Sequence, residues 1–355
     1  MKINKTTKSN FITYGIVILF FIIMQTMTAT GSLSSLFKGL LVPLCVYAIM
    51  AVSLNLTVGI LGELSLGHAG FMCVGAFSSA FFSMCMKETI TNGGLRFLIA
   101  IIIGALTAAL FGVLIGIPVL RLRGDYLAIV TLAFGEIIKN IVNVLYVGKD
   151  ANGFHISMKD AMSLQMEEGG KVIINGAQGI TGTPNDSTFV AGILILLITL
   201  FVVLNFVHSR SGRAVMAIRD NRIAAESVGI NISKYKLMAF ALSASMAGMA
   251  GALYAHNLST LTASPKNFGY NMSIMILVYV VLGGIGNIRG SVIAAVILTV
   301  LPELLRGFAD YRMLIYSIVL IVMMLFNWSP KAREFREKYS LKRLVAAKKA
   351  KKEDN

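Results

Sequence analysis

Ten stretches of this sequence are apolar over lengths close to the roughly 20 residues that a helix needs to cross a lipid bilayer. They lie at about 11–29, 37–60, 65–86, 95–117, 125–147, 188–208, 236–256, 271–284, 290–304 and 312–327, and the eighth and ninth are short. Hydrophobic residues make up 56% of the 355 residues, more than one soluble core can bury. The pattern predicts an all-α polytopic membrane protein of about ten transmembrane helices, with 1–330 forming a single transmembrane domain.

The basic residues predict the orientation of these helices. Lys and Arg are concentrated before the first apolar run, between the sixth and seventh runs, and after the last. Because cytoplasmic segments are enriched in Lys and Arg, we expect both termini and the loop at about 209–236 to be cytoplasmic. The net charge of +15 is explained by this orientation and by attraction of a basic tail at 331–355 to membrane lipid, so no nucleic-acid partner is expected.

The loop at about 148–187 is the longest polar segment, and the same orientation makes it external. A loop of this length usually has a function or is disordered. It could form a lip over an external opening, a contact for an extracytoplasmic partner, or a plain solvated linker.

The cytoplasmic loop at 209–236 has the pattern of a short docking helix. Asp220 can cap its amino end, Arg222 and Glu226 are spaced i to i+4 on one face, and Gly229 is suited to end it. Two successive alanines give it a small-residue surface that another protein could approach closely. A solvated connector is the alternative. The candidate docking residues are Arg219, Asp220, Arg222, Ala224, Ala225, Glu226 and Gly229.

Polar side chains and glycines interrupt the apolar sequence at 54–69. Polar groups within a membrane usually face the protein interior or water, and they mark substrate pathways as a default hypothesis. A helix hairpin at the cytoplasmic surface, with its carboxylate solvated and its histidine in a packing role, is the alternative. The candidate pathway residues are Asn55, Gly62, Glu63, Ser65 and His68.

Three further patterns concern architecture. The second to fifth and the seventh to tenth predicted helices would cross in opposite directions, which predicts inverted repeats. Glu136 and Lys139 are spaced i to i+3 and can neutralise each other as a structural ion pair. A stripe of small residues, suited to close helix packing, comprises Ser243, Ala247, Gly251 and Ala255.

The sequence lacks the motifs of several enzyme classes. It contains no phosphate-binding loop of the Gly-x-x-x-x-Gly-Lys-Ser/Thr type, no His or Cys residues at metal-binding spacing and no nucleophile elbow. We therefore expect no catalytic residues, no metal and no cofactor bound by this chain.

Four stretches together resemble a known family: 54–69; 124–134, which reads GDYLAIVTLAF; 212–230; and 283–290, which reads GGIGNIRG. They are similar to the membrane permease subunits of bacterial ABC importers for branched-chain amino acids. The extra amino-terminal run and the long loop at 148–187 resemble the LivM-type subunit of these importers.

The resemblance implies a multi-pass subunit of the bacterial plasma (inner) membrane that transports leucine, isoleucine and valine and is not itself an enzyme. It implies that the segment from Arg219 to Gly229 is a coupling helix that docks in a groove of a cytoplasmic ATPase. The implied partners are a homologous permease subunit, two ATP-binding subunits and an extracytoplasmic substrate-binding protein. Many relatives have Gln where this chain has Glu63.

Two alternatives stay open from the sequence. The same type of importer could carry urea, short amides or other small polar solutes. An ion-coupled secondary transporter would need ionisable groups within the membrane, for which Glu63, Glu136 and Lys139 are the candidates.

Overall fold

The computed structural model describes residues 5–122, 124–150, 153–167 and 169–328. The chain divides into two compact units, Met1–Val296 and Ile297–Asn355, and each is described by itself. The basic tail predicted at 331–355 lies outside the described residues, as do Lys2 and Arg123.

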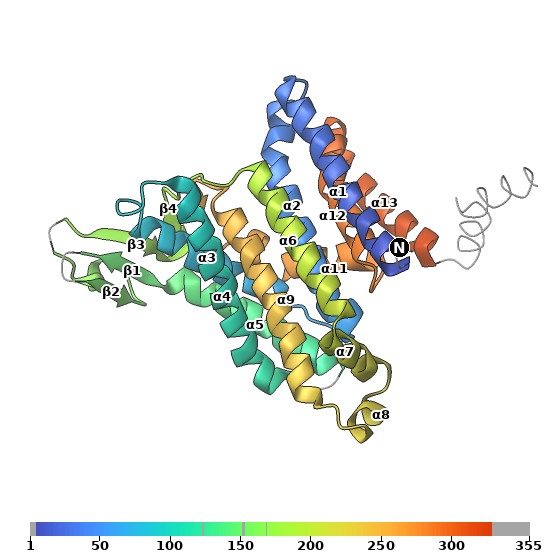
Figure 1. Ribbon diagram of the computed structural model, residues 1–355. Helices are drawn as coiled ribbons and strands as arrows, with labels where there is room; N and C mark the ends of the chain where they lie inside the picture. The colour runs from blue at the N-terminus through green and yellow to red at the C-terminus, as the bar shows by residue number, and fades with distance from the viewer. Residues whose placement is uncertain (1–4, 123, 151–152, 168, 329–355) are drawn as a thin grey trace, which may run out of the picture. The chain divides into compact units, whose positions relative to one another are not determined.

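Each of the ten predicted apolar runs is helical (Figure 1). The corresponding helices are α1 (Lys5–Ala29), α2 (Ser35–Asn55) with its π-helical continuation η1 (Leu56–Leu61), α3 (His68–Cys85), α4 (Gly93–Val119), α5 (Asp125–Val144), α6 (Phe189–His208), α9 (Ile232–Ala255), α11 (Tyr270–Gly283), α12 (Ile288–Leu304) and α13 (Arg312–Trp328).

Among the described residues, eight of these segments are long and apolar enough to cross a membrane. Helix α11 has only 14 residues, about 21 Å of helix, which confirms that the eighth run is short for a bilayer. The ninth run is longer than the sequence suggested, because the helical segment continues from Ile288 to Gly307.

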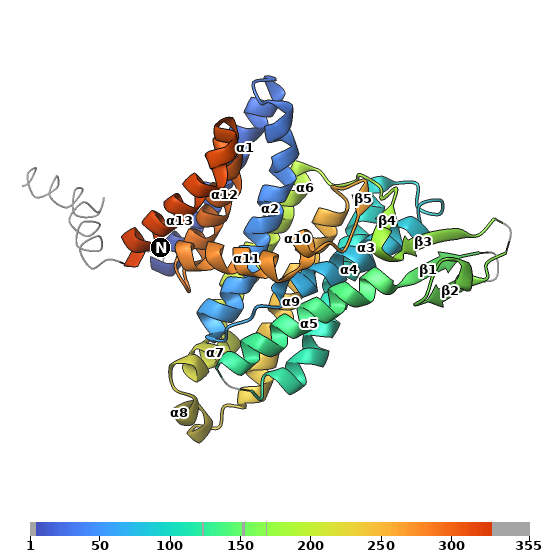
Figure 2. The same ribbon diagram turned by 180° about the vertical axis from the view of Figure 1, so that it is seen from behind.

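Helix α9 packs against α2, α3 and α4 in the first unit (Figures 1 and 2). Glycines bring the backbones together: a Cβ added at Gly75 would lie 2.4 Å from the Cα of Gly248, and one added at Gly248 would lie 2.3 Å from the carbonyl oxygen of Gly104. The predicted stripe of small residues from Ser243 to Ala255 is buried in this packing, as expected of residues that let helices approach closely.

Helices α2 and α3 are separated by a break in regular structure. The π-helix η1 ends at Gly62, whose φ of 78° is left-handed and favours glycine, and residues 62–67 run without helix to His68. The segment reaches into the bundle, because the Leu66 amide donates to Thr131 Oγ1 of α5 at 3.0 Å and the Ala69 amide donates to Ser273 Oγ of α11 at 3.1 Å. The helical structure of the polar stretch at 54–69 is therefore broken at 62–67, by a segment that is bonded to α5 and α11.

The loop at 148–187 is more ordered than the linker alternative predicts. A three-stranded antiparallel sheet of order β2-β1-β3 is formed by β1 (Tyr146–Lys149), β2 (Phe154–Ser157) and β3 (Lys171–Asn175), with Val147 opposite Ile156 and Ile174. A second sheet pairs β4 (Ile180–Thr181) with β5 (Thr260–Leu261), the segment that follows α9. Short 3₁₀ turns occur at η2 (Met162–Leu164) and η3 (Gly176–Gln178).

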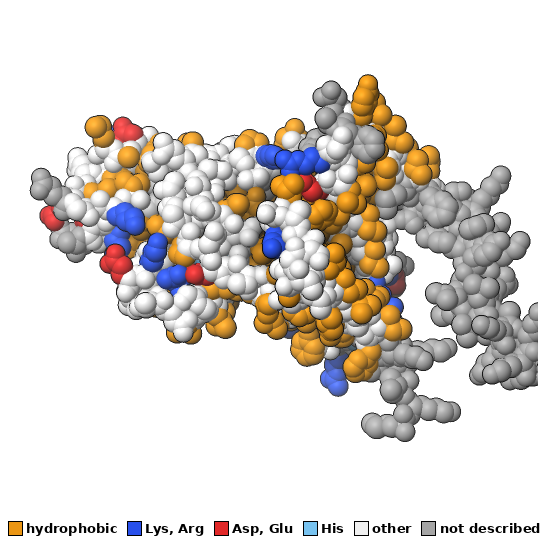
Figure 3. All heavy atoms as spheres, turned by 90° about the horizontal axis from the view of Figure 1, so that it is seen from above, with side chains coloured by type: hydrophobic (Ala, Val, Ile, Leu, Met, Phe, Trp, Pro, Cys, Tyr) orange, Lys and Arg blue, Asp and Glu red, His pale blue; other side chains and the backbone are white. Residues whose placement is uncertain are grey.

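The strands and the 209–231 segment lie at opposite ends of α6 and α9. In Figure 2 the strands project from the end where α9 stops, whereas α7 (Arg210–Asp220) and α8 (Arg222–Ser227) lie at the end where it starts. A view from above shows charged side chains of both signs around the strands, at the left (Figure 3).

The second unit contains the end of α12, a 3₁₀ segment η4 (Leu305–Tyr311) and α13. Arg306 pairs with Glu303 at 3.0 Å on the exposed surface of this unit. The short helix α10 (Pro265–Phe268) belongs to the first unit and leads into α11.

Candidate functional site

The predicted docking segment forms two helices joined at a sharp bend. Helix α7 begins after Ser209, whose hydroxyl accepts a hydrogen bond from the Gly212 amide at 3.0 Å. Helix α8 begins after Asn221, whose extended backbone lets its side-chain oxygen accept from the Ala224 amide at 3.0 Å. The prediction that Asp220 caps this helix is wrong, because Asp220 is the last residue of α7 and its carboxylate pairs with Arg219 at 2.9 Å.

The other end of α8 is closed as the sequence predicts. Gly229 has φ of 83°, and its amide donates to the Glu226 carbonyl at 3.0 Å. The next amide, of Ile230, donates to the Ala225 carbonyl at 3.1 Å. These two bonds form a Schellman motif, which explains the glycine, since other residues rarely adopt this backbone conformation. The predicted role of Gly229 in ending the helix is confirmed.

Helix α8 has one buried side and one side open to solvent. Ala225 is buried in a small apolar cluster with Ile218 and Ile232, which fastens α8 to α7 and α9. On the open side, Ile223 is 81% exposed and Val228 is 74% exposed. These two aliphatic side chains were not among the predicted docking residues, although their position in a charged segment was a usable signal.

The remaining predicted docking residues are placed as follows. Ala224 and Glu226 are exposed, and Arg222 is half-buried. Within the described part of the chain, Arg222 and Glu226 form no ion pair, so the predicted i to i+4 pair is absent there. Both charges remain available to a partner.

Two of the predicted pathway residues have direct structural partners. Asn55 is fully buried, receives a hydrogen bond from the Gly286 amide at 2.8 Å and donates to Ser291 Oγ at 2.7 Å. His68 is buried, and its Nε2 lies 2.7 Å from Ser53 Oγ. The packing role given as the alternative for His68 agrees with this contact.

Glu63 forms an ion pair with Lys236 of α9, and both side chains are largely buried. The alternative in which Glu63 is simply solvated is therefore wrong, because a buried lysine needs a partner of opposite charge. This partner could not be predicted, since nothing in the sequence spacing links positions 63 and 236. Ser65 is also buried, and its hydroxyl has no hydrogen-bond partner among the described residues.

The docking and pathway sets, predicted independently, are in contact. Arg219 of α7 donates from Nη1 to the carbonyl oxygen of Gly59 in η1 at 2.8 Å. The Arg219 side chain also covers Gly62, where an added Cβ would lie 2.5 Å from the Arg219 Cγ. The end of the broken helix is thus in direct contact with the end of α7.

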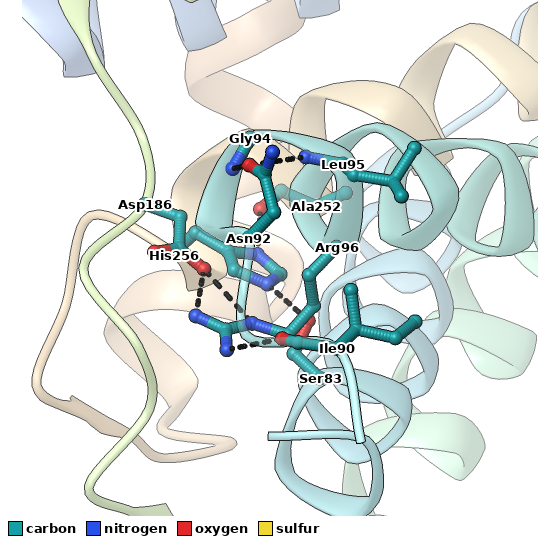
Figure 4. Close-up of polar contacts among 9 residues, drawn as sticks. All are labelled: Ser83, Ile90, Asn92, Gly94, Leu95, Arg96, Asp186, Ala252 and His256. Carbon is teal, nitrogen blue, oxygen red and sulfur yellow. Dashed lines mark hydrogen bonds and ion pairs between the residues drawn. The ribbon is translucent and has the colours of Figure 1, made fainter. Parts of the chain in front are cut away.

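A second polar cluster lies at the strand end of the bundle (Figure 4). Arg96 of α4 binds Asp186 Oδ2 through Nε at 3.1 Å and Nη2 at 2.6 Å, and its Nη1 donates to the Ile90 carbonyl at 3.2 Å. His256 lies beside this pair, and burial lowers its pKa below the usual range. Its Nδ1 donates to the Ala252 carbonyl at 2.8 Å, which leaves Nε2 to accept from Ser83 at 2.7 Å.

The predicted ion pair between Glu136 and Lys139 is confirmed. The Tyr270 amide, at the first residue of α11, also donates to Glu136 Oε1 at 2.8 Å. This carboxylate is therefore neutralised by a lysine and by a helix amino terminus. Among the described residues no group of three or more His, Cys, Asp or Glu side chains could hold a metal ion.

Residues 36–327 match the family described as branched-chain amino acid transport system / permease component. The chain is 36% identical over 295 residues to the high-affinity branched-chain amino acid transport system permease protein LivM of Escherichia coli, an alignment that covers 81% of this chain and 67% of LivM. No solved structure matches the chain significantly.

Two further relatives are more distant. LivH of Escherichia coli, also named a high-affinity branched-chain amino acid transport system permease protein, is 22% identical over 79% of this chain and 88% of its own length. The fructose import permease protein FruG of Bifidobacterium longum is 26% identical over 40% of this chain and 44% of its own length. These matches confirm the expectation of a transport subunit that is not an enzyme. The chain therefore belongs to the family of branched-chain amino acid transport permeases and is of the LivM type.

Proposed function

We propose that this chain is the membrane-spanning subunit of an ATP-driven importer that carries branched-chain amino acids across the bacterial plasma membrane. The observation that carries the proposal is α8, a short helix capped at both ends that holds Ile223 and Val228 out into solvent. Aliphatic side chains that are exposed together on a surface occur at contacts with other proteins.

The described contacts divide the predicted docking residues into two groups. Ala224 and Glu226 are exposed beside the two aliphatic side chains and would contact an ATPase subunit directly. The small and apolar residues would fill a groove of the ATPase, and the charges of Arg222 and Glu226 would contact polar residues at the edge of that groove. Arg219, Asp220, Ala225 and Gly229 instead hold the helix in place through the contacts described above.

The remaining partners follow from the same assembly. It would contain a homologous permease subunit, two ATPases that bind the ATP, and an extracytoplasmic binding protein that delivers the amino acid. The proposed orientation has α7 and α8 in the cytoplasm with both termini, because the basic residues are concentrated there. The strands of 146–181 would then face the binding protein. The basic tail would lie against anionic lipid.

In the proposed mechanism, ATP binding closes the pair of ATPases and displaces α8. The transmembrane helices then change between outward-open and inward-open arrangements, whose populations depend on the state of the ATPases. The permease needs only a transient path, since the binding protein selects the substrate.

The candidate residues for the transport path are reduced to those at the break between η1 and α3. Asn55 and His68 are held by Ser291 and Ser53, which supports a structural role for both. Ser65 remains a polar group without a described partner, and Gly62 and Glu63 lie at the same break. A buried unpartnered hydroxyl is costly, so it favours a role in contact with water or substrate.

The test is to purify the chain from detergent-solubilised native membranes, to identify the proteins that co-purify and to measure their ATP hydrolysis with and without leucine. We expect two ATPase subunits and a second permease. Recovery of the chain alone, with uptake that survives ATP depletion while an ion gradient is held, would instead identify a secondary transporter.

A second candidate is the same type of importer for a different small polar solute. The similarity to a permease named for fructose import favours this second candidate, because it shows that proteins with related sequences are named for the transport of other solutes. Competition of leucine uptake by urea, short amides and fructose in the reconstituted transporter separates the two candidates.

A further inference from the structure

The carboxyl end of the broken helix is closed by a side chain from α7. In a helix the last carbonyl groups lack intrahelical partners, and they carry partial negative charge. In η1 the Thr57 carbonyl is bound by the Glu63 amide at 3.1 Å. The Gly59 carbonyl is bound by Arg219 Nη1 at 2.8 Å. A guanidinium is well suited to this position because it brings both a donor and a positive charge.

The same guanidinium is tied to its own helix. Arg219 Nε and Nη2 donate to Asp220 Oδ1 at 3.1 and 2.9 Å. The planar group therefore connects the end of α7 to the end of η1 with three hydrogen bonds. Its aliphatic part lies against Gly62, where any larger residue would collide with it.

From Gly59 the contacts continue to the turn between α11 and α12. A Cβ added at Gly59 would lie 2.4 Å from the Gly286 nitrogen, so the two backbones touch. Asn55 bridges the same two segments through its bonds to the Gly286 amide and to Ser291 Oγ. A displacement of η1 therefore cannot occur without moving this turn or breaking these bonds.

The element between these contacts is a π-helix. π-Helical turns are rare, and they occur mostly at functional sites. Thr57 of η1 also donates to Ser243 of α9 at 2.8 Å, so η1 has a partner on α9 as well. Coupling between two sites is carried by an element that has two discrete arrangements, and η1 is the element to which we assign this role.

We propose that Arg219 is a positioning residue that passes the displacement of α7 and α8 to η1, and through Gly59 and Asn55 to the turn between α11 and α12. The inference rests on the proposed function, because the displacement is supplied by the ATPases. In this inference Arg219 acts through contacts within the permease, whereas the exposed side of α8 contacts the ATPase.

The test uses the complete transporter reconstituted in liposomes, with Arg219→Gln as the variant. Arg210→Gln is the matched control, since Arg210 is an exposed arginine at the other end of the same helix. Leucine uptake is measured per ATP hydrolysed. We expect Arg219→Gln to keep its ATPase subunits and their hydrolysis, but to lose roughly tenfold in uptake per ATP, the factor for a lost hydrogen bond from a charged donor. The control should match the wild-type protein.

Hydrogen exchange with and without ATP provides the second readout. In the wild-type transporter ATP should change exchange both at 222–229 and at 56–63, whereas in Arg219→Gln the change at 56–63 should disappear. If that change persists and uptake per ATP stays within about twofold of wild type, the inference is overturned. If wild-type protein binds no ATPase, the proposed function fails, and that outcome is recognised before any variant is compared.

Arg219→Lys is a second variant that keeps the test informative if Arg219→Gln does not fold. It keeps the charge but has no planar fork, so it can bind the Gly59 carbonyl or Asp220 but not both in the same way. Its uptake per ATP should lie between those of Arg219→Gln and the wild-type protein. Full coupling in Arg219→Lys together with full coupling in Arg219→Gln would exclude transmission through this side chain.

Discussion

Arg96 and Arg219 make the same set of hydrogen bonds at opposite ends of the bundle. Each places Nε and Nη2 on one carboxylate oxygen and Nη1 on a backbone carbonyl. Their settings differ, because the Arg96 side chain is 8% exposed and binds a residue far away in sequence, whereas Arg219 is 37% exposed and binds its neighbour. The bonds of Arg96 are shielded from water at the strand end, whereas water can compete for the bonds of Arg219 at the α8 end.

The largest expected effect is at Arg96. Arg96→Met should lower the free energy of unfolding by roughly 3 kcal/mol, since it leaves Asp186 with an uncompensated, mostly buried charge. Arg219→Met should cost about half as much, roughly 1.5 kcal/mol, because the Asp220 carboxylate stays in water and only the bond to the Gly59 carbonyl lies in a partly buried site. Thermal unfolding of both variants in detergent measures the difference. Equal losses in the free energy of unfolding would show that the two arginines stabilise their ends of the bundle to the same extent.

Arg306→Met is the control for loss of an exposed arginine, since its pair with Glu303 lies at the surface. We expect a change of only a few tenths of a kcal/mol.

Charge reversal at Glu226 is expected to leave stability unchanged and to act on transport. Glu226→Arg places a positive charge at the exposed rim of α8 and should reduce ATP-driven leucine uptake roughly tenfold by weakening the ATPase contact. Glu88→Arg, at an exposed position near the strand end, is the matched control. Normal uptake in Glu226→Arg would remove this residue from the docking surface.

A smaller effect is expected at Gly229. Gly229→Val should destabilise the end of α8 by about 1–2 kcal/mol, because φ of 83° is strained for a branched residue although no atom would clash with the new side chain. The amount of ATPase that co-purifies should fall accordingly. Gly15→Val adds the same volume in open space without positive φ and should change neither quantity.

Glu63→Gln tests whether the carboxylate at the break after η1 belongs to the transport path. The amide oxygen of glutamine can still accept a hydrogen bond from Lys236, so assembly should be preserved, but the buried lysine loses its opposite charge and the free energy of unfolding should fall by roughly 2 kcal/mol. Uptake kinetics measured for leucine, valine and urea then test the path, with Glu88→Gln as control. Identical kinetics for every solute would place Glu63 outside it.

The transmembrane helices could be predicted from the sequence because apolar length is a local property. The carboxyl end of α8 could also be predicted from the sequence, because the backbone conformation at Gly229 favours glycine. The amino-terminal cap was assigned one residue too early, since Asp220 and Asn221 are both capping residues and only the bend in the backbone decides between them.

The contacts across the bundle could not be predicted from spacing. Lys236 and Glu63 approach each other only because α9 packs beside the break after η1, and Arg219 reaches Gly59 because α7 packs against η1. The strands at 146–175 were missed because they are four or five residues long and lie within a polar loop. Short strands depend on their partners more than on their own composition.

The glycine contacts of α9 have a mechanical consequence. Where the backbones of α3, α4 and α9 touch without intervening side chains, the close packing leaves little space for the helices to move relative to one another. Only residues 228–231 join α8 to α9, so a displacement of α8 is passed directly to α9. Because α9 is packed closely against α3 and α4, we expect these three helices to move together as one block. We expect the hinges of the transport cycle to lie at the edges of this block.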